Sequence, residues 1–550
     1  MLDKIKILLV VVLFSIFISC NEDFLETTPT DAVTPTIALS SAEDMQKVLN
    51  GIHRTLYAQL QTVIPGGSSN RSGNHYWIPL GDNLAGHLIH SADADNLGWR
   101  TEMQWNSHTV PTSLTNELLW YHRYNTILHA NLIIGKINEG TLPVTSDLKA
   151  IEGQAYAYRA YALLSLVQHY AKGYLIGNPT TDAGVPIILT PQATGPRATV
   201  EEVYKQIGDD LDAAISAFSN ATPRLTGDPK YKSQLNINVA HGLKARWALS
   251  KGEWKTAADE AVLARQGFPL MNEADWKLGF NTNDLPEVIW GSNVVDTETT
   301  FFRSYFYLAS NTFNGAQIRS NPKIADKRLI DAIPDTDYRK DVFIIDAPNT
   351  NSSAANQQGG LDDQGQPKDP NYANDLAGYD ARKAELYNEY GLTTRFNLHP
   401  YMHFKLKNKN PGSTDPDDII YMRTSEMYLI EAEAKAMMDD VIGAQNALRP
   451  LGEERDSAYD VTIYNTKETL MEHIKFQRKL ELWGEGFGYT DKIRWDEGID
   501  HGANGGSGAS AVLYQGAYQV EKPSVNNDWI FKIPQKEIDA NPNITPNDQN

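Results

Sequence analysis

The sequence predicts a mostly α-helical protein, in which a scaffold of paired, repeat-like helices carries a second, loop-rich lobe containing short strands. Three observations predict this class. Apolar or small residues recur every three or four positions in many ranges. Two of the resulting helix pairs resemble each other, and two long segments, residues 61–113 and 281–420, show few helix signals. At 550 residues the chain also exceeds the roughly 250–300 residues at which one core stops growing, which favours stacked units.

The first twenty residues are typical of a lipoprotein signal peptide. Two lysines precede a nearly unbroken apolar run, Ile7 to Ile18, which is shorter than the ~20 residues that cross a bilayer as a helix. A serine then stands directly before Cys20, the single cysteine of the chain, as in a bacterial lipobox. We expect cleavage after residue 19, acylation of Cys20 and a lipidated tether over residues 20–40. An ordinary secretory signal with a chance cysteine is the alternative.

Helical periodicity covers several ranges of the chain. They are about Ser41–Leu60, Leu114–Asn138, Asp147–Ala171, Val200–Phe218, Val239–Lys251, Trp254–Gln266, Tyr421–Met438, Val441–Glu454 and Lys467–Trp483. In the third of these, Ile151, Ala155 and Tyr158 fall on one helix face. The ranges predict an N-terminal scaffold over residues 41–280, interrupted by the first loop segment, and a C-terminal scaffold with a terminal motif over residues 421–550.

Two of these helix pairs predict the type of repeat. In the second helix of each pair, small or apolar residues recur at i, i+4 and i+7: Ala257, Ala261 and Ala264 in one, and Ala444, Leu448 and Leu451 in the other. Such faces let antiparallel helices approach closely, as in tetratricopeptide units, which stack into one array. We therefore predict a tetratricopeptide-like helical-repeat scaffold.

The two segments without helix signals are predicted to carry the ligand-binding loops. Glycine, asparagine, proline and aromatic residues are frequent in both, and connections this long are usually functional or disordered. Disorder is disfavoured because many tryptophan and tyrosine rings would be left in water. Short strands are predicted at Val288–Val295 and Trp529–Ile533.

Composition and motifs exclude several classes of function. The chain has 69 acidic against 49 basic residues and a net charge of −20, which repels phosphate backbones, so no nucleic-acid partner is expected. No Walker-type loop, Gly-x-Ser-x-Gly elbow or cysteine metal site occurs. We expect no catalytic residue, no cofactor and no metal, with incidental calcium at Asp415, Asp417 and Asp418 left open. His87 and His90 have a near-metal spacing but lack an obvious third ligand.

Charges of both signs gather on one helix and its following turn near the C-terminus. Glu481, Glu485 and Asp491 could be mistaken for catalytic carboxylates, but Arg478 and Arg494 stand among them. Mixed clusters of this kind are more often packing networks, so we predict a structural role. Glycosidase carboxylate pairs have no linear signature and must be judged in space.

Several segments match one known family. They are Asn21–Glu26 after the lipobox, Glu152–Tyr161, Arg423–Ala434, the charged motif from Arg478 to Trp495, and an ending in Ile533-Pro534, Asn541-Pro542 and Gln549-Asn550. Jointly they resemble SusD-like (SusD/RagB) outer-membrane nutrient-binding lipoproteins. Gln477 and Gly488 depart from the pattern, where Glu and Arg are common, which puts fine ion pairing in doubt.

The resemblance implies a non-enzymatic lipoprotein that is lipid-anchored at the cell surface, in the outer membrane. Such a protein captures an oligosaccharide and hands it to a SusC-like TonB-dependent transporter, on which it sits as a lid. A peptide-binding lid of the same type of transporter is one alternative, and a surface glycoside hydrolase is a less favoured one.

Aromatic side chains on the loops are the candidate ligand-binding groups. Their ring faces attract the slightly positive C–H hydrogens of a sugar, and nearby polar side chains can fix its hydroxyls. Trp99 is the first choice because Gly98 and Arg100 suggest a turn that presents the ring beside a polar handle. The other candidates are Trp77, Tyr76, Asn83, Arg100, Trp105, Tyr305, Tyr307 and Asn311. The alternative for each ring is a place in the core of the loop-rich lobe.

Overall fold

The computed structural model describes residues 35–59, 73–90, 100–191, 194–299, 302, 304–315, 319–352, 358–500 and 519–545. The expected signal peptide, Cys20 and most of the tether therefore lie outside the described residues. Within these ranges, no helix combines the length and the apolar character needed to cross a bilayer.

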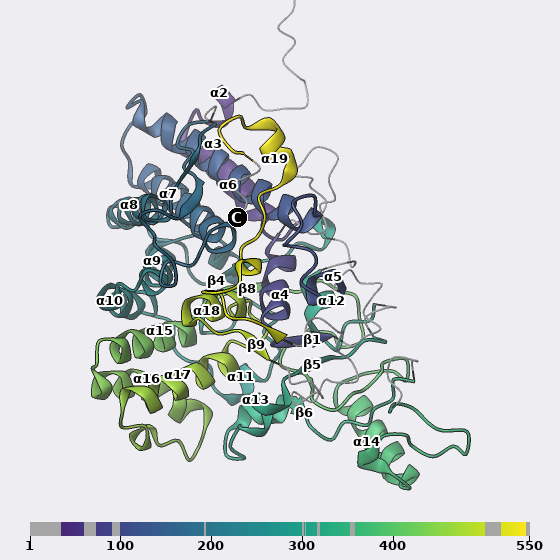
Figure 1. Ribbon diagram of the computed structural model, residues 1–550. Coiled ribbons are helices and arrows are strands. Elements are labelled where there is room, and N and C mark those ends of the chain that lie inside the picture. The colour runs from purple at the N-terminus through teal and green to yellow at the C-terminus, as the bar shows by residue number, and fades with distance from the viewer. Residues whose placement is uncertain are drawn as a thin grey trace, which may run out of the picture.

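One continuous array of helices runs along one side of the molecule (Figure 1). It consists of α6 (Leu114–Asn138), α7 (Ser146–Tyr170), α8 (Val200–Phe218), α9 (Ile237–Lys251), α10 (Trp254–Ala264), α15 (Thr424–Met437), α16 (Val441–Arg455) and α17 (Lys467–Glu481). Helix α10 packs directly against α15, so the array continues across the sequence gap that the loop-rich lobe occupies. The predicted mostly α, tetratricopeptide-like scaffold is confirmed.

Small side chains let the helices at this crossing approach one another. Ala257, Ala261 and Ala264 on α10 have no exposed surface, as the i, i+4, i+7 spacing predicts. An ion pair adds to the contact between α9 and α15, where Arg246 Nη2 lies 2.7 Å from Glu426 Oε2. The N-terminal helix α3 (Ala42–Thr55) packs on α7 at the other end of the array.

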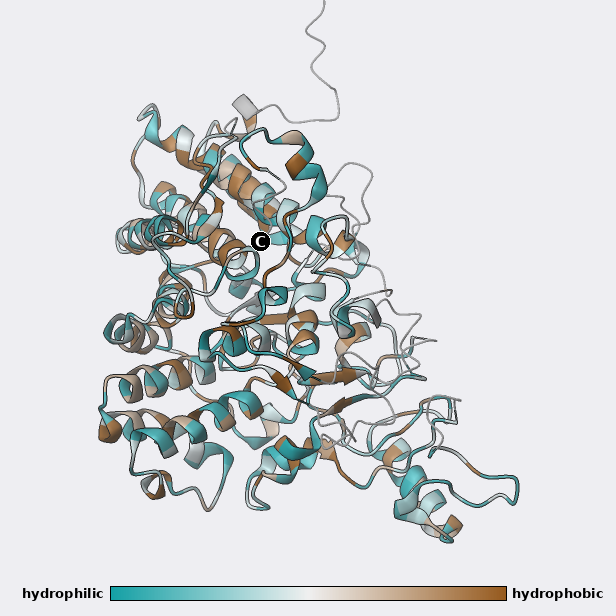
Figure 2. Ribbon diagram, viewed as in Figure 1, coloured by the Kyte–Doolittle hydropathy of each residue, from teal (hydrophilic) through white to brown (hydrophobic). Residues whose placement is uncertain are grey.

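The loop-rich lobe contains more regular structure than the sequence predicts. Its described part holds α4 (Asn74–Leu84), α12 (Tyr305–Ala309), α14 (Leu376–Glu389) and an antiparallel sheet in the order β1 (Leu88–His90), β5 (Lys323–Ala325), β7 (Met402–His403), β6 (Phe343–Ile344). Figure 2 shows hydrophobic residues on β1 and β5 at the centre of this lobe. The expectation of few helices in residues 61–113 was wrong for α4. Every residue of α4 except Ile78 is buried, so no amphipathic pattern marks it.

The two predicted strands have different outcomes. Val288–Val295 contains β4 (Val288–Ser292), which pairs antiparallel with β8 (Ile419–Arg423). Trp529–Ile533 forms no strand, because a 3-10 turn ends at Trp529 and the chain then runs along the array, where Phe531 N–H donates to His169 O over 2.8 Å. Strand β8 leads directly into α15, so the helix predicted from Tyr421 begins at Thr424.

Shorter elements complete the described chain. They are α2 (Pro35–Ala38), α5 (Arg100–Met103), β2 (Ala183–Pro186), β3 (Arg197–Thr199), α11 (Glu273–Trp276), α13 (Lys327–Asp331), α18 (Gly488–Trp495), β9 (Ile499–Asp500), β10 (Gln519–Val520) and α19 (Gln535–Ala540). Helix α18 lies against α4, where a Cβ on Gly81 would come within 2.6 Å of Gly486 O. This close approach joins the loop-rich lobe to the C-terminal motif.

Candidate functional site

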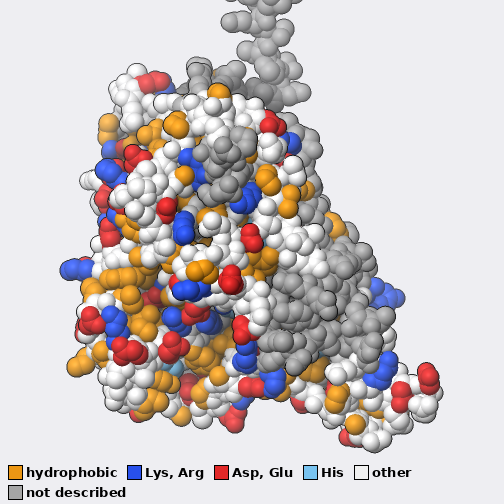
Figure 3. All heavy atoms as spheres, in the orientation of Figure 1, with side chains coloured by type: hydrophobic (Ala, Val, Ile, Leu, Met, Phe, Trp, Pro, Cys, Tyr) orange, Lys and Arg blue, Asp and Glu red, His pale blue; other side chains and the backbone are white. Residues whose placement is uncertain are grey.

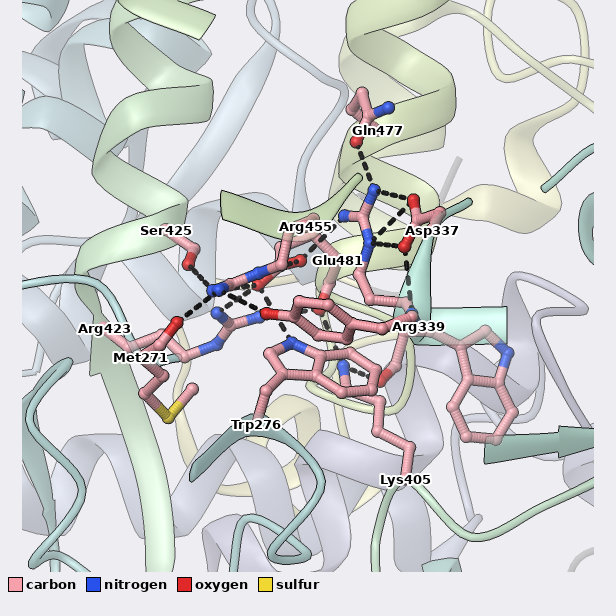
Figure 4. Close-up of polar contacts among 12 residues, drawn as sticks. Met271, Trp276, Asp337, Arg339, Lys405, Arg423, Ser425, Arg455, Gln477 and Glu481 are labelled. Atoms are coloured by element: carbon pink, nitrogen blue, oxygen red, sulfur yellow. Dashed lines mark hydrogen bonds and ion pairs between the residues drawn. The ribbon is translucent and has the colours of Figure 1, made fainter. Parts of the chain in front are cut away.

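A carboxylate without solvent access lies where the array meets the loop-rich lobe (Figure 4). Glu481 on α17 accepts hydrogen bonds from Arg339 Nη1 at 2.8 Å, Arg423 Nη1 at 2.7 Å and Arg455 Nε at 3.2 Å. Burial alone would raise the pKa of Glu481, but the guanidinium groups of Arg455, Arg423 and Arg339 outweigh it and hold the pKa well below its usual range. Glu481 is therefore ionised and fully engaged, which does not suit a general acid or base.

The charges around Glu481 balance. We call this set the Glu481 network: the cations Arg339, Arg423, Arg455 and Lys405 face the carboxylates of Asp337, Glu287, Glu481 and Glu485. All eight side chains are nearly or fully buried. The predicted packing role is thus confirmed for Glu481 and Glu485. Gln477, which replaces the common Glu, accepts from Arg339 Nη2 at 2.7 Å, and this contact needs no further charge.

A second, smaller network joins three helices of the C-terminal part. Asp491 on α18 accepts from Arg478 Nε of α17 at 2.7 Å and from Arg494 Nε at 3.0 Å, and Arg494 also pairs with Glu433 of α15. Asp491 is buried, and the two arginines lower its pKa although burial alone would raise it. These residues also have the packing role that the sequence predicts.

The predicted ligand-binding residues divide into two groups. Trp99 and the side chain of Arg100 lie outside what the structure describes. All the others are buried, with at most 9% of their surface exposed: Tyr76, Trp77, Asn83, Trp105, Tyr305, Tyr307 and Asn311. The described candidates thus occupy core positions, which is the alternative the sequence left open for each ring. Their contact with a sugar stays a prediction. None of the described candidate rings faces solvent.

The polar groups of these buried residues hold the loop-rich lobe together. Tyr76 Oη donates to Glu102 Oε1 over 2.9 Å, and Tyr305 Oη donates to Gly484 O over 3.1 Å. Asn311 Nδ2 donates to the main-chain oxygens of β5 and β7, over 2.8 and 2.9 Å. These bonds form an internal framework of the lobe.

Only some of the candidates are brought together. Helices α4 and α12 pack on each other, so Tyr76, Trp77 and Asn83 share a region with Tyr305 and Tyr307. Trp105 instead packs edge-on against Trp529 of the C-terminal segment, with ring centroids 4.6 Å apart.

The expected absence of a metal site is left as a prediction. Asp418 Oδ2 accepts from Asn283 N–H at 2.9 Å, and Asp417 Oδ2 accepts from Asn408 Nδ2 at 3.1 Å, so protein groups already engage both carboxylates. In the part of the chain that the structure describes, no group of three or more His, Cys, Asp and Glu side chains is arranged to hold a metal.

Several hollows open among the described residues. A groove of about 1170 Å³ lies along α17 and the segment 456–464 before it, and one of about 820 Å³ lies between α3, α7 and the chain before α9. A third hollow of about 170 Å³ lies between α4, α6, α7, α9 and the α17–α18 corner. We call it the junction cleft. Figure 3 shows acidic and basic side chains interspersed over the face in view, so no field of one sign marks a binding surface there.

The junction cleft is lined by charged and aromatic residues that the sequence did not single out as ligand-binding. They include Arg123 of α6, Tyr161 of α7, Arg246 of α9, Trp290 of β4 and Phe487 between α17 and α18. No spacing signal could have found them, because each comes from a different element of the fold.

Comparison with known proteins decides the family. The model of the SusD family matches residues 273–550, which is 278 of the 550 residues. The chain belongs to the SusD family. A second model, described as starch-binding and associating with the outer membrane, matches residues 23–234. Membership agrees with the prediction of a binding protein rather than an enzyme.

Relatives of the chain extend over most of its length. A SusD-like protein from Formosa agariphila is 23% identical over 428 residues, covering 72% of this chain and 75% of that protein. A SusD-like carbohydrate-binding protein from Bacteroides vulgatus has the same fold, with a TM-score of 0.68 and 22% identity over 92% of this chain and 98% of that one. Surface glycan-binding protein A from Bacteroides thetaiotaomicron, solved with laminarihexaose, has a TM-score of 0.61 and 14% identity over 92% and 99% of the two chains.

Proposed function

We propose that this chain is a cell-surface, lipid-anchored glycan-binding protein that captures an oligosaccharide and delivers it to a SusC-like TonB-dependent transporter. The observation that carries the proposal is the family match. The two family models together span residues 23–234 and 273–550, and one of them is described by starch binding and the outer membrane. The lipobox-like ending at Cys20 supports the anchor.

The anchoring of the loop bases supports a binding surface built from both loop segments. Gln59 N–H donates to Glu298 O over 3.1 Å, and Gln59 Nε2 donates to Phe302 O over 2.8 Å. Residues 59 and 302 therefore lie side by side although about 240 positions separate them. Loops that start from one fixed base can offer ring and amide groups to the same sugar chain.

Glycan binding is tested with the soluble chain from residue 21 onward on a glycan array, with a peptide library beside it. We expect binding to oligosaccharides and none to peptides. Trp99→Ala should then weaken binding of the cognate glycan by about 1–3 kcal/mol, the range for truncating a well-packed aromatic contact. The Tm should stay unchanged. Trp105→Ala is the matched control, because loss of this buried ring should lower the Tm instead.

Other outcomes of this screen would change the proposal. Binding to peptides alone would support the peptide-binding lid, and release of reducing sugar by the purified protein would support a hydrolase. Unchanged glycan affinity in Trp99→Ala would remove Trp99 from the site.

Anchoring and partnership are tested in the membrane. Cys20→Ala should release the protein into the soluble fraction of a strain that lacks the transporter, without unfolding it. The wild-type protein should co-purify from outer membranes with a large β-barrel in mild detergent. Isolation as a free monomer under those conditions would contradict the transporter partnership.

A further inference from the structure

We propose that the junction cleft is a binding site for a small oxyanion, either free in solution or carried as the acidic group of a sugar. The proposal does not depend on the function proposed above, because a free inorganic oxyanion would bind whether or not the protein captures glycans. It is carried by one unpaired buried charge and two unpaired buried donors that line the same cleft.

The unpaired charge is Arg123 on α6, which is 3% exposed. Its Nε donates to Ser165 Oγ over 3.0 Å and its Nη2 to Asn74 Oδ1 over 3.0 Å, while Nη1 lies 3.2 Å from His122 Nδ1. Burial lowers the pKa of His122 to about 3, so at neutral pH this ring is uncharged and can accept a hydrogen bond. Arg123 forms no ion pair with any carboxylate of the described ranges, and uncharged partners leave its positive charge uncompensated in a low-dielectric site.

The two unpaired donors belong to Trp290 and Arg478. Trp290 Nε1 and Arg478 Nη1 are buried atoms that have no hydrogen-bond acceptor among the described residues. Both side chains line the junction cleft, and Trp290 has no exposed surface while Arg478 is 3% exposed. Buried donors in native proteins are nearly always satisfied, so an acceptor that the chain itself does not supply is expected there.

Ring contacts connect these groups across the cleft. The Arg123 guanidinium lies over the Tyr161 ring, 4.8 Å from its centroid, and Tyr161 meets Trp290 edge-on at 5.3 Å. On another wall, the Arg478 guanidinium lies over the Phe487 ring at 5.2 Å. The residues of α6, β4 and α17 that carry these donors thus line one cleft of about 170 Å³.

The other charges of the cleft cancel one another. Arg246 pairs with Glu426, and Arg478 and Arg494 pair with Asp491 and Glu433. Glu485 belongs to the Glu481 network, in which four cations face four carboxylates. The cleft is therefore left with one surplus positive charge and two free donors.

An anion with several acceptor atoms would supply both the missing negative charge and the missing acceptors. Water could accept from the free donors, and the volume corresponds to about six water molecules, but water cannot neutralise Arg123. Charge-assisted bonds from arginine to an oxyanion are among the strongest in proteins. Partly exposed Gln168 and Thr490 line the cleft, which gives a small ligand a way in from solvent.

The test titrates the soluble chain from residue 21 onward with sodium sulfate, sodium glucuronate and glucose, with ionic strength held constant by sodium chloride. We expect saturable binding of at least one of the two anions by calorimetry, a rise in Tm with it, and no effect of glucose at the same concentrations. Stronger binding of glucuronate would assign the site to the acid group of a sugar. Stronger binding of sulfate would assign it to a free oxyanion.

Two variants locate the binding. Trp290→Phe removes one donor and keeps a ring, so anion affinity should fall about tenfold, while the Tm of the unliganded protein should hardly change because the N–H has no protein partner. Arg123→Gln should abolish anion binding. Trp247→Phe is the matched control: its Nε1 donates to Tyr204 O over 2.8 Å, outside the cleft, so this variant should lower the Tm and leave anion affinity unchanged.

The proposal would be overturned by two results. One is the absence of saturable binding of sulfate and of glucuronate to the wild-type chain. The other is binding that Trp290→Phe and Arg123→Gln leave intact, which would assign the anion to a different surface. A blank glycan array would leave the sulfate measurement unaffected, so failure of the glycan function and failure of this site can be told apart.

Discussion

The helical array and its junction with the loop-rich lobe fill their interiors in opposite ways. Where α10 meets its neighbours in the array, Ala257, Ala261 and Ala264 form an apolar face of small side chains. At the junction, the Glu481 network buries four cations and four carboxylates. Burial of an apolar face is a non-directional interaction, so it stabilises any arrangement that excludes water. Paired charges tolerate only the geometry in which each finds its partner, so we infer that the network fixes how the lobe sits on the array.

Removing one charge from the network should have the largest effect. Glu481→Gln keeps the shape of the side chain but leaves three guanidinium groups short of a negative charge. We expect a loss of about 3–5 kcal/mol, the usual result of breaking a buried ion pair from one side, measured by urea unfolding. Lys205→Ala is the control, because it breaks an exposed pair with Asp209 and should change stability little. Equal losses in the two variants would contradict the comparison.

Placing a charge on the apolar face should have the next largest effect. Ala257→Asp puts a carboxylate where the wild-type side chain has no exposed surface. The expected cost is about 3 kcal/mol, since the charge is buried without a partner. Lys255→Ala on the exposed side of the same helix is the matched control. A wild-type Tm for Ala257→Asp would show that the face is open to water.

Lowering the pH should destabilise the protein through its buried histidines before it affects the Glu481 network. Burial lowers the pKa of His108, His122 and His403 to about 3, so the folded protein keeps these rings neutral. The unfolded chain takes up protons below about pH 6.5, so stability falls as pH falls from there, by about 1 kcal/mol per histidine near pH 5.5. The network carboxylates Glu481 and Glu485 have lowered pKa values, so their contribution is present above about pH 4.5 and lost only below it.

Urea unfolding near pH 7 and near pH 5.5 measures this difference. His403→Gln can still donate to Ala309 O, the partner of His403 Nε2, and should reduce the acid-induced loss by one histidine's share. An unchanged loss in this variant would mean that His403 is protonated in the folded state.

The smallest effect is expected inside the framework of the loop-rich lobe. Tyr305→Phe removes the hydroxyl that donates to Gly484 O and leaves the ring in place. We expect a loss of about 1 kcal/mol, the net value of one ordinary hydrogen bond. Because the ring is buried, glycan affinity should stay the same in calorimetry. Weaker glycan binding by Tyr305→Phe with an unchanged Tm would assign Tyr305 to the binding site.

The helical array could be predicted because its signals are local. The bounds of α6 and α8 match their predicted ranges, and Thr199 and Glu202 form a reciprocal capping box at the start of α8. The start of α15 was missed because Tyr421 belongs to a buried strand, and a short apolar run fits a strand or a helix equally well.

The site could be predicted only in its chemistry. Ring composition shows that aromatic groups must pack somewhere, but burial of Tyr76 or Tyr305 depends on contacts with chain segments far away in sequence. The junction cleft lies further out of reach, because Arg123, Trp290 and Arg478 come from three elements that only the folded chain brings together. The ligand-binding role of Trp99 stays a prediction, because this residue lies outside the described ranges.

Main-chain hydrogen bonds fix the points at which chain segments leave the described frame of the lobe. Asn74 N–H donates to Leu56 O over 2.7 Å, and Gln59 N–H donates to Glu298 O, so main-chain atoms hold both junctions whatever side chains stand between them. Doubling the length of a flexible loop costs only about 0.6 kcal/mol. These main-chain bonds hold the described ends of the chain at residues 59 and 73 independently of the side chains between them.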